Sequence, residues 1–442
     1  MPLVPENFRG GPFPLPLVTE LDPPPVLAGM KQVVLDPEGR LKQLHVVPEQ
    51  IAKSQGPAPS GSAPDWGPLF RAAGLDATRF RPVESRWSPD SYADGRAAWE
   101  GPHPERPGLT MRVEAAAWRG RPVSFLWIGP WSLSSRDVPD QQTAGARAAD
   151  IAWLTILLTL LFAGAWMARR NLRAGRGDRR GALRLAAAVF ALQLSTWALG
   201  AHHVPVLEEF DVFAIGLANA AMLALFFWIV YVALEPFMRR HWPRMLISWT
   251  RLLSGGWRDP LVGRDLLVGA SAGAVIGILI GPIRRFIPGW IGDAPAVPRV
   301  TGDPSSVRAG LAWLISTSGF SLAWVLGLVM FLVLIRRVVR QEWIAGIVVA
   351  LLFSANYLGT PPLHVTLPVV AVATGVLVVV AIRFGFLAAL VCRTCDVLLG
   401  GFVTTADPSA WYFYIGAIAM GLILALAVWG LRTSTLGEAA PG

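Results

Sequence analysis

Long apolar runs occupy most of the chain from residue 151 onward, separated by short segments rich in arginine or proline. A helix needs about 20 apolar residues to cross the hydrocarbon core of a bilayer, and charged segments bound such helices. The pattern therefore predicts about nine membrane spans, of which the sixth and eighth are short or carry polar residues. The candidate spans cover residues 151–168, 183–200, 212–234, 263–281, 312–335, 343–357, 363–382, 384–400 and 409–431.

The segment before these spans has the pattern of a soluble domain. Two β-prone runs flank the turn "DPEG" (36–39), where proline presets φ and glycine accepts a positive φ, so a hairpin is predicted there. The stretch "PDWGPLFRAAGL" (64–75) predicts a short helix. Residues 109–131 alternate on either side of Arg119-Gly120, which predicts a second hairpin.

Together these patterns predict an all-α polytopic helical membrane bundle of about nine spans, preceded by a small soluble α+β domain. Stretches of distinct composition give the expected division of the chain. The predicted parts are a Pro-rich N-terminal segment (1–30), an α+β domain (31–148), a bundle (149–434) that includes an interfacial amphipathic helix (237–254), and a C-terminal tail (435–442).

The formal charge of +9 would suit a nucleic-acid binder, but most of the arginines lie in short loops between apolar runs. Cytoplasmic loops of membrane proteins are enriched in Lys and Arg, so this distribution orients the bundle. The prediction is a multi-pass protein of a bacterial inner membrane, with residues 1–148 outside the cytoplasm and the C-terminus inside. The inner loops would hold Arg169, Arg170, Arg173, Arg176, Arg179, Arg180, Arg184, Arg239, Arg240, Arg244, Arg251, Arg258, Arg264, Arg336, Arg337, Arg340, Arg383 and Arg432, and the outer loops only Arg284, Arg285, Arg299 and Arg308.

An exported N-terminal domain needs a signal peptide or a preceding span. Residues 1–22 have neither a basic n-region nor an apolar h-region. We therefore expect either that a natural upstream span is missing from the sequence or that the first span drives translocation, and we favour the first.

The stretch "FMRRHWPRMLISWTRLLSGGWRDPLVGRD" (237–265) combines arginine and tryptophan. At about 100° per residue, Arg240, Arg244 and Arg251 fall within roughly 40° of one another, with Trp249 on the opposite side. This predicts an interfacial helix whose arginines contact anionic lipid at the cytoplasmic face, while Trp242 and Trp249 occupy the headgroup boundary. Nucleic-acid binding is not expected, because no soluble basic face or recognition motif is present.

Four glycines recur at every fourth position in "GASAGAVIGILIG". This spacing lets helix backbones approach closely in lipid, so it predicts a packing seam within the bundle or between protomers of a homo-oligomer. The four are Gly269, Gly273, Gly277 and Gly281.

Polar groups within predicted spans are costly and need partners. Arg393 and Asp396 are three residues apart and can pair on one helix. With Gln193 and Asn219 they leave a small-solute transporter or channel open as an alternative, although no internal repeat is visible. "STSGFS" (316–321) resembles the interruption of a broken helix.

An intramembrane hydrolase is the third alternative, because "HHVPVLEEF" places His202, His203, Glu208 and Glu209 at a predicted membrane face. Its spacing fits no established metal-ligand pattern, so a polar outer loop is expected instead. Cys392 and Cys395 form an isolated C-x-x-C in an apolar run, which is typical of small core residues. The pattern predicts no metal, no cofactor and no catalytic residue.

Residues 231–269, "YVALEPFMRRHWPRMLISWTRLLSGGWRDPLVGRDLLVG", closely resemble a segment of bacterial transmembrane serine/threonine protein kinases. Three further stretches are similar to the same family: "APDWGPLFRAAGLDATRF", "RVEAAAWRGRPVSF" and "DPSAWYFYIGAIAMGLILALAVWGLRTS". The resemblance covers about residues 31–434. In that family a cytoplasmic kinase domain precedes a transmembrane helix, an extracytoplasmic domain and a multi-span bundle.

The catalytic motifs of the family are absent from this sequence. It contains no G-x-G-x-x-G loop, no V-A-I-K lysine, no H-R-D and no D-F-G, so no kinase residue can be assigned to any position. The resemblance therefore implies a non-catalytic sensor and membrane anchor of a receptor-like kinase. The implied partners are the bilayer and a kinase domain, either in the same polypeptide or in another one.

Overall fold

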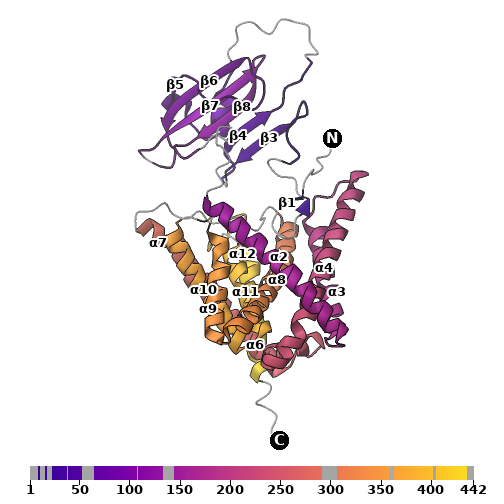
Figure 1. Ribbon diagram of the computed structural model, residues 1–442. Coiled ribbons are helices and arrows are strands. Elements are labelled where there is room, and N and C mark those ends of the chain that lie inside the picture. The colour runs from indigo at the N-terminus through magenta and orange to yellow at the C-terminus, as the bar shows by residue number, and fades with distance from the viewer. Residues whose placement is uncertain are drawn as a thin grey trace. The chain divides into compact units, whose positions relative to one another are not determined.

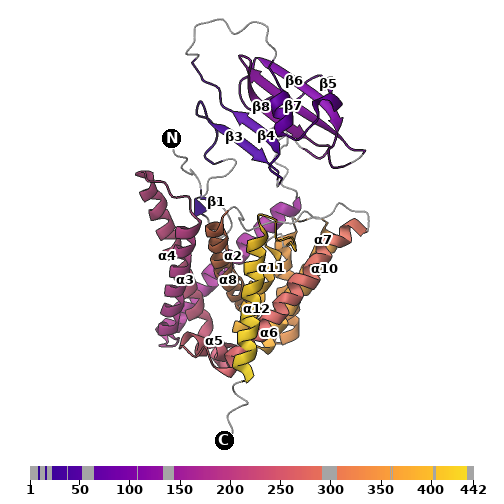
Figure 2. The same ribbon diagram turned by 180° about the vertical axis from the view of Figure 1, so that it is seen from behind.

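The computed structural model describes residues 8–9, 15–16, 22–36, 38–51, 64–106, 108–132, 144–290, 306–358, 360, 362–401 and 405–435. These residues form two compact units, which we call the sheet unit and the helical unit (Figures 1 and 2). Most of the predicted Pro-rich segment and of the C-terminal tail lie outside the described residues.

The sheet unit contains one six-stranded antiparallel sheet in the order β3-β4-β8-β7-β6-β5. A short helix, α1 (Gly67–Ala72), and a 3₁₀ turn, η1 (Ala77–Arg79), lie between β4 and β5 in the chain. The soluble α+β part that the sequence predicts is thus present. The strands are β3 (Lys31–Leu35), β4 (Leu41–Val46), β5 (Arg81–Val83), β6 (Gly95–Pro102), β7 (Thr110–Trp118) and β8 (Arg121–Ile128); the ladder β1 (Phe8–Arg9) with β2 (Leu15–Pro16) is separate from this sheet.

Both predicted hairpins are confirmed, and their turn residues explain why they form. The Asp36 carboxylate accepts hydrogen bonds from the backbone nitrogens of Glu38 (3.1 Å) and Arg40 (2.8 Å), closing the β3–β4 turn. In the β7–β8 turn, Arg119 (φ +52°) and Gly120 (φ +74°) both adopt positive φ. Two consecutive positive φ values are typical of the type I′ turn, whose twist matches that of antiparallel strands.

The core of the sheet unit lies between α1 and one face of the sheet. Phe70 of α1 meets the rings of Phe80, Trp99 and Phe125 edge-on, at centroid distances of 5.5, 5.2 and 5.8 Å. On the opposite face, the buried Glu114 accepts hydrogen bonds from Ser85 Oγ, Arg86 N and Arg112 Nε. The segment after β5 is therefore held against the sheet by polar contacts, whereas α1 is held by aromatic packing.

The helical unit contains seven helical segments that are long and apolar enough to cross a bilayer, counted over the described residues. The prediction of a multi-span helical membrane protein is therefore confirmed. The helices are α2 (Ala144–Arg173), α3 (Arg179–Gly200), α4 (Glu208–His241), α5 (Pro243–Leu253), α6 (Pro260–Val275), the π-helical turn η2 (Ile276–Ile280), α7 (Gly281–Trp290), α8 (Val307–Val339), α9 (Glu342–Ser354), the 3₁₀ turn η3 (Ala355–Tyr357), α10 (Leu363–Arg383), α11 (Phe386–Gly400) and α12 (Phe413–Thr435).

The predicted count of nine spans is wrong. The sixth candidate is the short pair α9–η3, and the eighth is α11, a helix of 15 residues that extends for about 22 Å against a hydrocarbon thickness of about 30 Å. Hydropathy alone cannot make this distinction, because a helix that packs inside a bundle is as apolar as a helix that faces lipid. Helix α11 is of the first kind. Its residues Leu387, Ala388 and Ala389 are buried in the bundle.

Helix α8 is the centre of the helical unit. The most apolar 18-residue window of α8 is 61% buried, against 22% to 39% for the other spans, and Figures 1 and 2 show α8 between the remaining helices. The "STSGFS" segment, which resembles the interruption of a broken helix, lies within the continuous helix α8. Ser316 and Ser318 instead donate hydrogen bonds to the carbonyls of Trp313 and Leu314 in the preceding turn. Such back-bonding lets small polar residues persist in an apolar helix.

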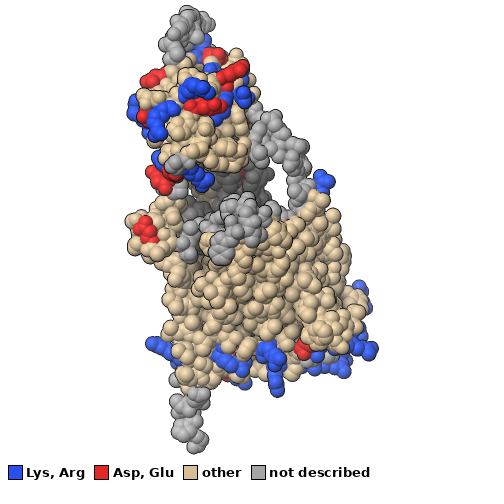
Figure 3. All heavy atoms as spheres, turned by 90° about the vertical axis from the view of Figure 1, so that its left-hand side faces the viewer, with Lys and Arg blue, Asp and Glu red and all other residues tan. Residues whose placement is uncertain are grey.

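Arginines gather at one end of the helical unit, which we call the arginine end. This end is formed by the C-terminal ends of α2, α4, α8, α10 and α12 and the N-terminal ends of α3 and α6. Figure 3 shows their side chains along one edge of the helical unit, next to an uncharged surface. Helix α5 runs across this end (Figure 2). The clustering has the form that the positive-inside rule describes.

Candidate functional site

A proline inside α4 lies at the arginine end. Pro236 lies inside α4 and has no N–H to donate to the carbonyl of Val232, four residues earlier. Asn171 of α2 replaces this donor: its Nδ2 lies 2.9 Å from Val232 O and 3.1 Å from Ala233 O. The side chain of one helix thus satisfies a carbonyl that the proline leaves free in another.

The turn between α2 and α3 contacts α4 next to this proline. Asp178 accepts a hydrogen bond from Gly181 N (2.8 Å) and so caps α3, and its own N–H donates to Glu235 at 3.2 Å. Glu235 is only 3% exposed and also forms an ion pair with Arg239 one helical turn later. We call Asn171, Asp178, Glu235, Pro236 and Arg239 the Pro236 joint. It connects three helices through polar contacts at the edge of an apolar core.

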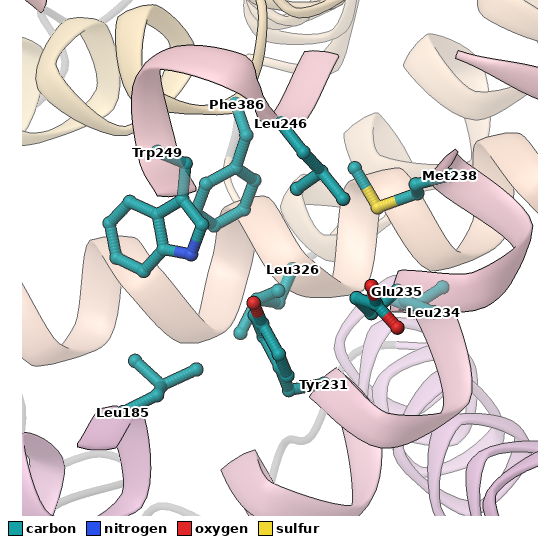
Figure 4. Close-up of a pocket in the computed structure, with 9 residues that line it drawn as sticks. All are labelled: Leu185, Tyr231, Leu234, Glu235, Met238, Leu246, Trp249, Leu326 and Phe386. Carbon is teal, nitrogen blue, oxygen red and sulfur yellow. The ribbon is translucent and has the colours of Figure 1, made fainter. Parts of the chain in front are cut away.

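An enclosed cavity lies directly beside the joint. It is lined by side chains of α3, α4, α5, α8 and α11 and measures about 10 Å³, enough for one water molecule (Figure 4). Glu235 lines the cavity, and the Tyr231 hydroxyl points into it (Figure 4). This hydroxyl is buried and has no hydrogen-bond partner among the described residues. The surface that the cavity exposes is apolar, so the Tyr231 hydroxyl is left without a partner beside it in the described part of the chain.

A second contact ties the end of α4 to the turn between α8 and α9. Trp242 donates its indole N–H to Glu342 Oε1 (2.9 Å), and the Arg336 guanidinium lies 4.3 Å above the Trp242 ring. Arg336 also pairs with Glu342 at 3.4 Å. The chain can turn sharply from α8 into α9 because Arg340 adopts a left-handed conformation (φ +61°).

Replacing Asn171 by leucine is expected to destabilise the folded protein by about 1–3 kcal/mol, because Val232 O would remain buried without a donor. The effect should depend on Pro236. In a Pro236→Ala background, residue 236 supplies the missing N–H, so Asn171→Leu should cost clearly less. The four proteins can be compared by SDS titration in mixed micelles; an equal cost of Asn171→Leu in both backgrounds would contradict this role.

The predicted interfacial helix is divided between two elements. Residues 237–241 end α4, the chain breaks at Trp242, and α5 runs only from Pro243 to Leu253. Arg240 and Arg244 are both exposed but lie on different helices. Arg251 forms an ion pair with Asp259, the residue that caps α6, at 2.7 Å. A single helical wheel drawn over residues 237–254 therefore gives the wrong position of Arg240 relative to Arg244 and Arg251.

Of the two predicted interfacial tryptophans, Trp249 is buried and Trp242 is half-buried. Trp249 is 6% exposed and packs edge-on against Phe386 of α11, with 5.0 Å between ring centroids. Trp242 is held between Glu342 and Arg336. Since the apolar face of α5 is covered by the bundle, its aromatic residue packs inward rather than toward lipid.

Three of the four spaced glycines lie against α11. An added Cβ would meet backbone oxygens at two of them, at 2.5 Å from Ala388 O for Gly269 and closer still to Cys392 O for Gly273. At Gly277 it would lie 2.7 Å from Leu399. Gly281 lies beyond the π-helical turn, where the nearest atom belongs to its own helix. The contacts of the first three glycines are therefore within the bundle.

Arg393 and Asp396 form an ion pair within α11. The Arg393 guanidinium also lies 4.8 Å from the ring of Trp324 on α8, which adds a cation–π contact. Both side chains are mostly buried, and Cys392 and Cys395, on the same helix, are fully buried. Gln193 is buried in α3 and Asn219 is half-buried in α4, on other helices.

The segment proposed for a hydrolase forms a local turn. His203 Nδ1 lies 2.5 Å from Glu209 Oε1, and the other carboxylate oxygen of Glu209 accepts a hydrogen bond from Val204 N. His202 is exposed, and the side chain of Glu208 lies outside the described residues. In the part of the chain that the structure describes, no three His, Cys, Asp or Glu side chains come together as a metal site.

One group of charged and aromatic side chains in the sheet unit had no signal in the sequence. Lys42 Nζ lies 3.4 Å from the centroid of the Trp127 ring, and burial lowers the pKa of Lys42 below its usual value. Burial alone would raise the pKa of Asp36, but hydrogen bonds from Arg40 outweigh it and bring this pKa below its ordinary value. Strand pairing between β4 and β8 brings Lys42 and Trp127 together, which spacing along the chain does not reveal.

The Pro236 joint was also missed, although its sequence contains a usable signal. Glu235-Pro236 places a carboxylate beside a proline near the end of an otherwise apolar run, a costly pairing that needs partners from elsewhere. The partners themselves lie about 60 residues away.

In comparisons of sequence and structure, the chain matches no known protein family, no curated protein and no solved structure.

Proposed function

We propose that the chain is the sensing and membrane-embedded portion of a signalling protein of the transmembrane serine/threonine kinase type. The sheet unit would bind the signal outside the cytoplasm, and the helical unit would pass a conformational change to a kinase domain at the arginine end. The kinase domain would belong to the same polypeptide or to a partner. The chain itself would transfer no phosphate.

One observation carries this proposal: the stretch that resembles the kinase family, residues 231–269, contributes to two polar contacts at the arginine end. It contributes Glu235, Pro236 and Arg239 to the Pro236 joint. It also contributes Trp242 to the contact with the α8–α9 turn. Helix α4 thus contains a proline beside a buried carboxylate and contacts two separate turns. A helix of this kind can switch the bundle between discrete arrangements.

A small-solute transporter is the second candidate, and the geometry supports it less. A transport path needs polar groups that are available to a solute. Arg393 is instead engaged by Asp396 and Trp324, and the enclosed cavity at the joint has room for about one water and exposes only apolar surface.

The proposal is tested on membranes that contain the natural protein. An antibody against residues 64–106 is used to precipitate the solubilised protein, which is then incubated with ATP labelled in its γ-phosphate. We expect labelled phosphoserine or phosphothreonine, either in a band heavier than the 47.7 kDa of this chain or in a second subunit. The control is antibody blocked beforehand with purified chain. A band at 47.7 kDa without phosphotransfer above the control would contradict the proposal.

A further inference from the structure

An open groove of about 570 Å³ lies on the exposed surface of the Pro236 joint. It is formed by the α2–α3 turn and the end of α4, and the side chains that define it are those of Arg176, Asp178, Glu235, Arg239 and Arg240. Its size is in the range of pockets that bind small molecules. Glu235 lines both this groove and the enclosed cavity, so it separates the two.

The groove is basic where it is open. Three arginines face two carboxylates, and both carboxylates are already engaged: Glu235 by Arg239 and by Asp178 N, and Asp178 by the N-terminus of α3. Arg239 uses its Nε for this ion pair. Arg176 and Arg240 are exposed and have no ion-pair partner within the described part of the chain. Guanidinium groups in this state favour a phosphate, which they bind through paired hydrogen bonds.

The position of the groove favours a phosphate that carries acyl chains. Its walls are the α2–α3 turn and the end of α4, and the apolar windows of α2 and α4 are only 28% and 22% buried. Those helices therefore present most of their apolar surface to lipid, and the groove opens where that surface meets the arginine end. A ligand with an anionic head and apolar chains matches both surfaces, whereas a free phosphate matches only one.

We propose that this groove binds the phosphate headgroup of an anionic phospholipid. The headgroup contacts Arg176 and Arg240 and approaches the Nη nitrogens of Arg239. Because Arg239 is paired with Glu235, the bound lipid acts on the Pro236 joint. This binding site requires only that the helical unit lies in a bilayer, and it does not depend on a kinase partner.

The test uses the full chain in nanodiscs of phosphatidylcholine with a small fraction of spin-labelled phosphatidylglycerol, and it measures the motionally restricted fraction of the label. Arg176→Gln with Arg240→Gln should weaken the binding of phosphatidylglycerol about thirtyfold, which corresponds to about 1 kcal/mol for each arginine. The matched control is Arg258→Gln with Arg432→Gln, which removes the same charge from exposed positions outside the groove. The control should bind phosphatidylglycerol as the unchanged protein does.

Three outcomes would overturn the proposal. An equal loss in the control pair would mean that only diffuse charge attracts the lipid. Equal restriction of spin-labelled phosphatidylcholine would mean that the headgroup charge is not recognised. Displacement of the label by millimolar inorganic phosphate, but not by the same concentration of chloride, would assign the groove to free phosphate. Because the changed residues are exposed, gel filtration and circular dichroism should show that both double variants are folded.

Discussion

Arg393→Leu is expected to destabilise the folded protein by about 3–5 kcal/mol, because it leaves Asp396 mostly buried without its counter-charge. Asp396→Leu should cost a similar amount, since Arg393 would then be mostly buried without a carboxylate, in contact with the ring of Trp324 and with Tyr357. The double substitution should cost less than the sum of the two, because it leaves neither charge behind.

SDS titration in mixed micelles measures all four proteins on the same scale. Additive costs in the double variant would mean that Arg393 and Asp396 act separately, which would contradict the pairing. The same cycle bears on transport, because a pair that only stabilises α11 can be replaced without loss of function once stability is restored.

Gly273→Leu is expected to destabilise the helical unit by about 3 kcal/mol, the upper range for overpacking. Its first side-chain atom would meet the backbone oxygen of Cys392, and no rotamer change can remove that contact. Helices α6 and α11 would have to separate along their seam. Asp259 at the start of α6 pairs with Arg251 of α5, and Arg393 of α11 contacts Trp324 of α8, so the loss should extend to these neighbouring helices.

Gly421→Leu in α12 is the matched control. A Cβ at Gly421 meets no atom within 4 Å, and the residue is exposed in the middle of an apolar helix. The same chemical change should therefore be neutral or stabilise by up to about 1 kcal/mol, because leucine has a higher helix propensity than glycine. Thermal unfolding of both variants in detergent separates the two effects. Equal melting temperatures would contradict the close approach of α6 to α11.

The order of apolar runs and turn residues was enough to predict the two-part architecture. The hairpin at Asp36–Gly39 forms because local side-chain bonds and a positive φ close it, and both signals are visible in four residues. The long spans are equally local, because each is apolar over its whole length. Such features depend on neighbours in the sequence, so they can be predicted from it.

The candidate site depends on contacts between distant segments. Trp249 has the same position on a helical wheel whether it faces lipid or Phe386, and only the place of α11 decides between them. Likewise, Pro236 predicts a free carbonyl in α4 but not that Asn171 will satisfy it. The short α11 follows the same principle, since its burial comes from the helices around it.

We propose that the sheet unit lies outside the cytoplasm and that the arginine end faces the cytoplasm. Tyr92→Cys, exposed in the sheet unit, and Ser254→Cys, exposed between α5 and α6, are tested in an expressing bacterium with a maleimide that cannot cross membranes. Cys392 and Cys395 are fully buried and provide a low background. The account predicts that intact spheroplasts label Tyr92→Cys and that Ser254→Cys reacts only after the membrane is permeabilised. Labelling of both positions in intact spheroplasts, or of neither until permeabilisation, would contradict it.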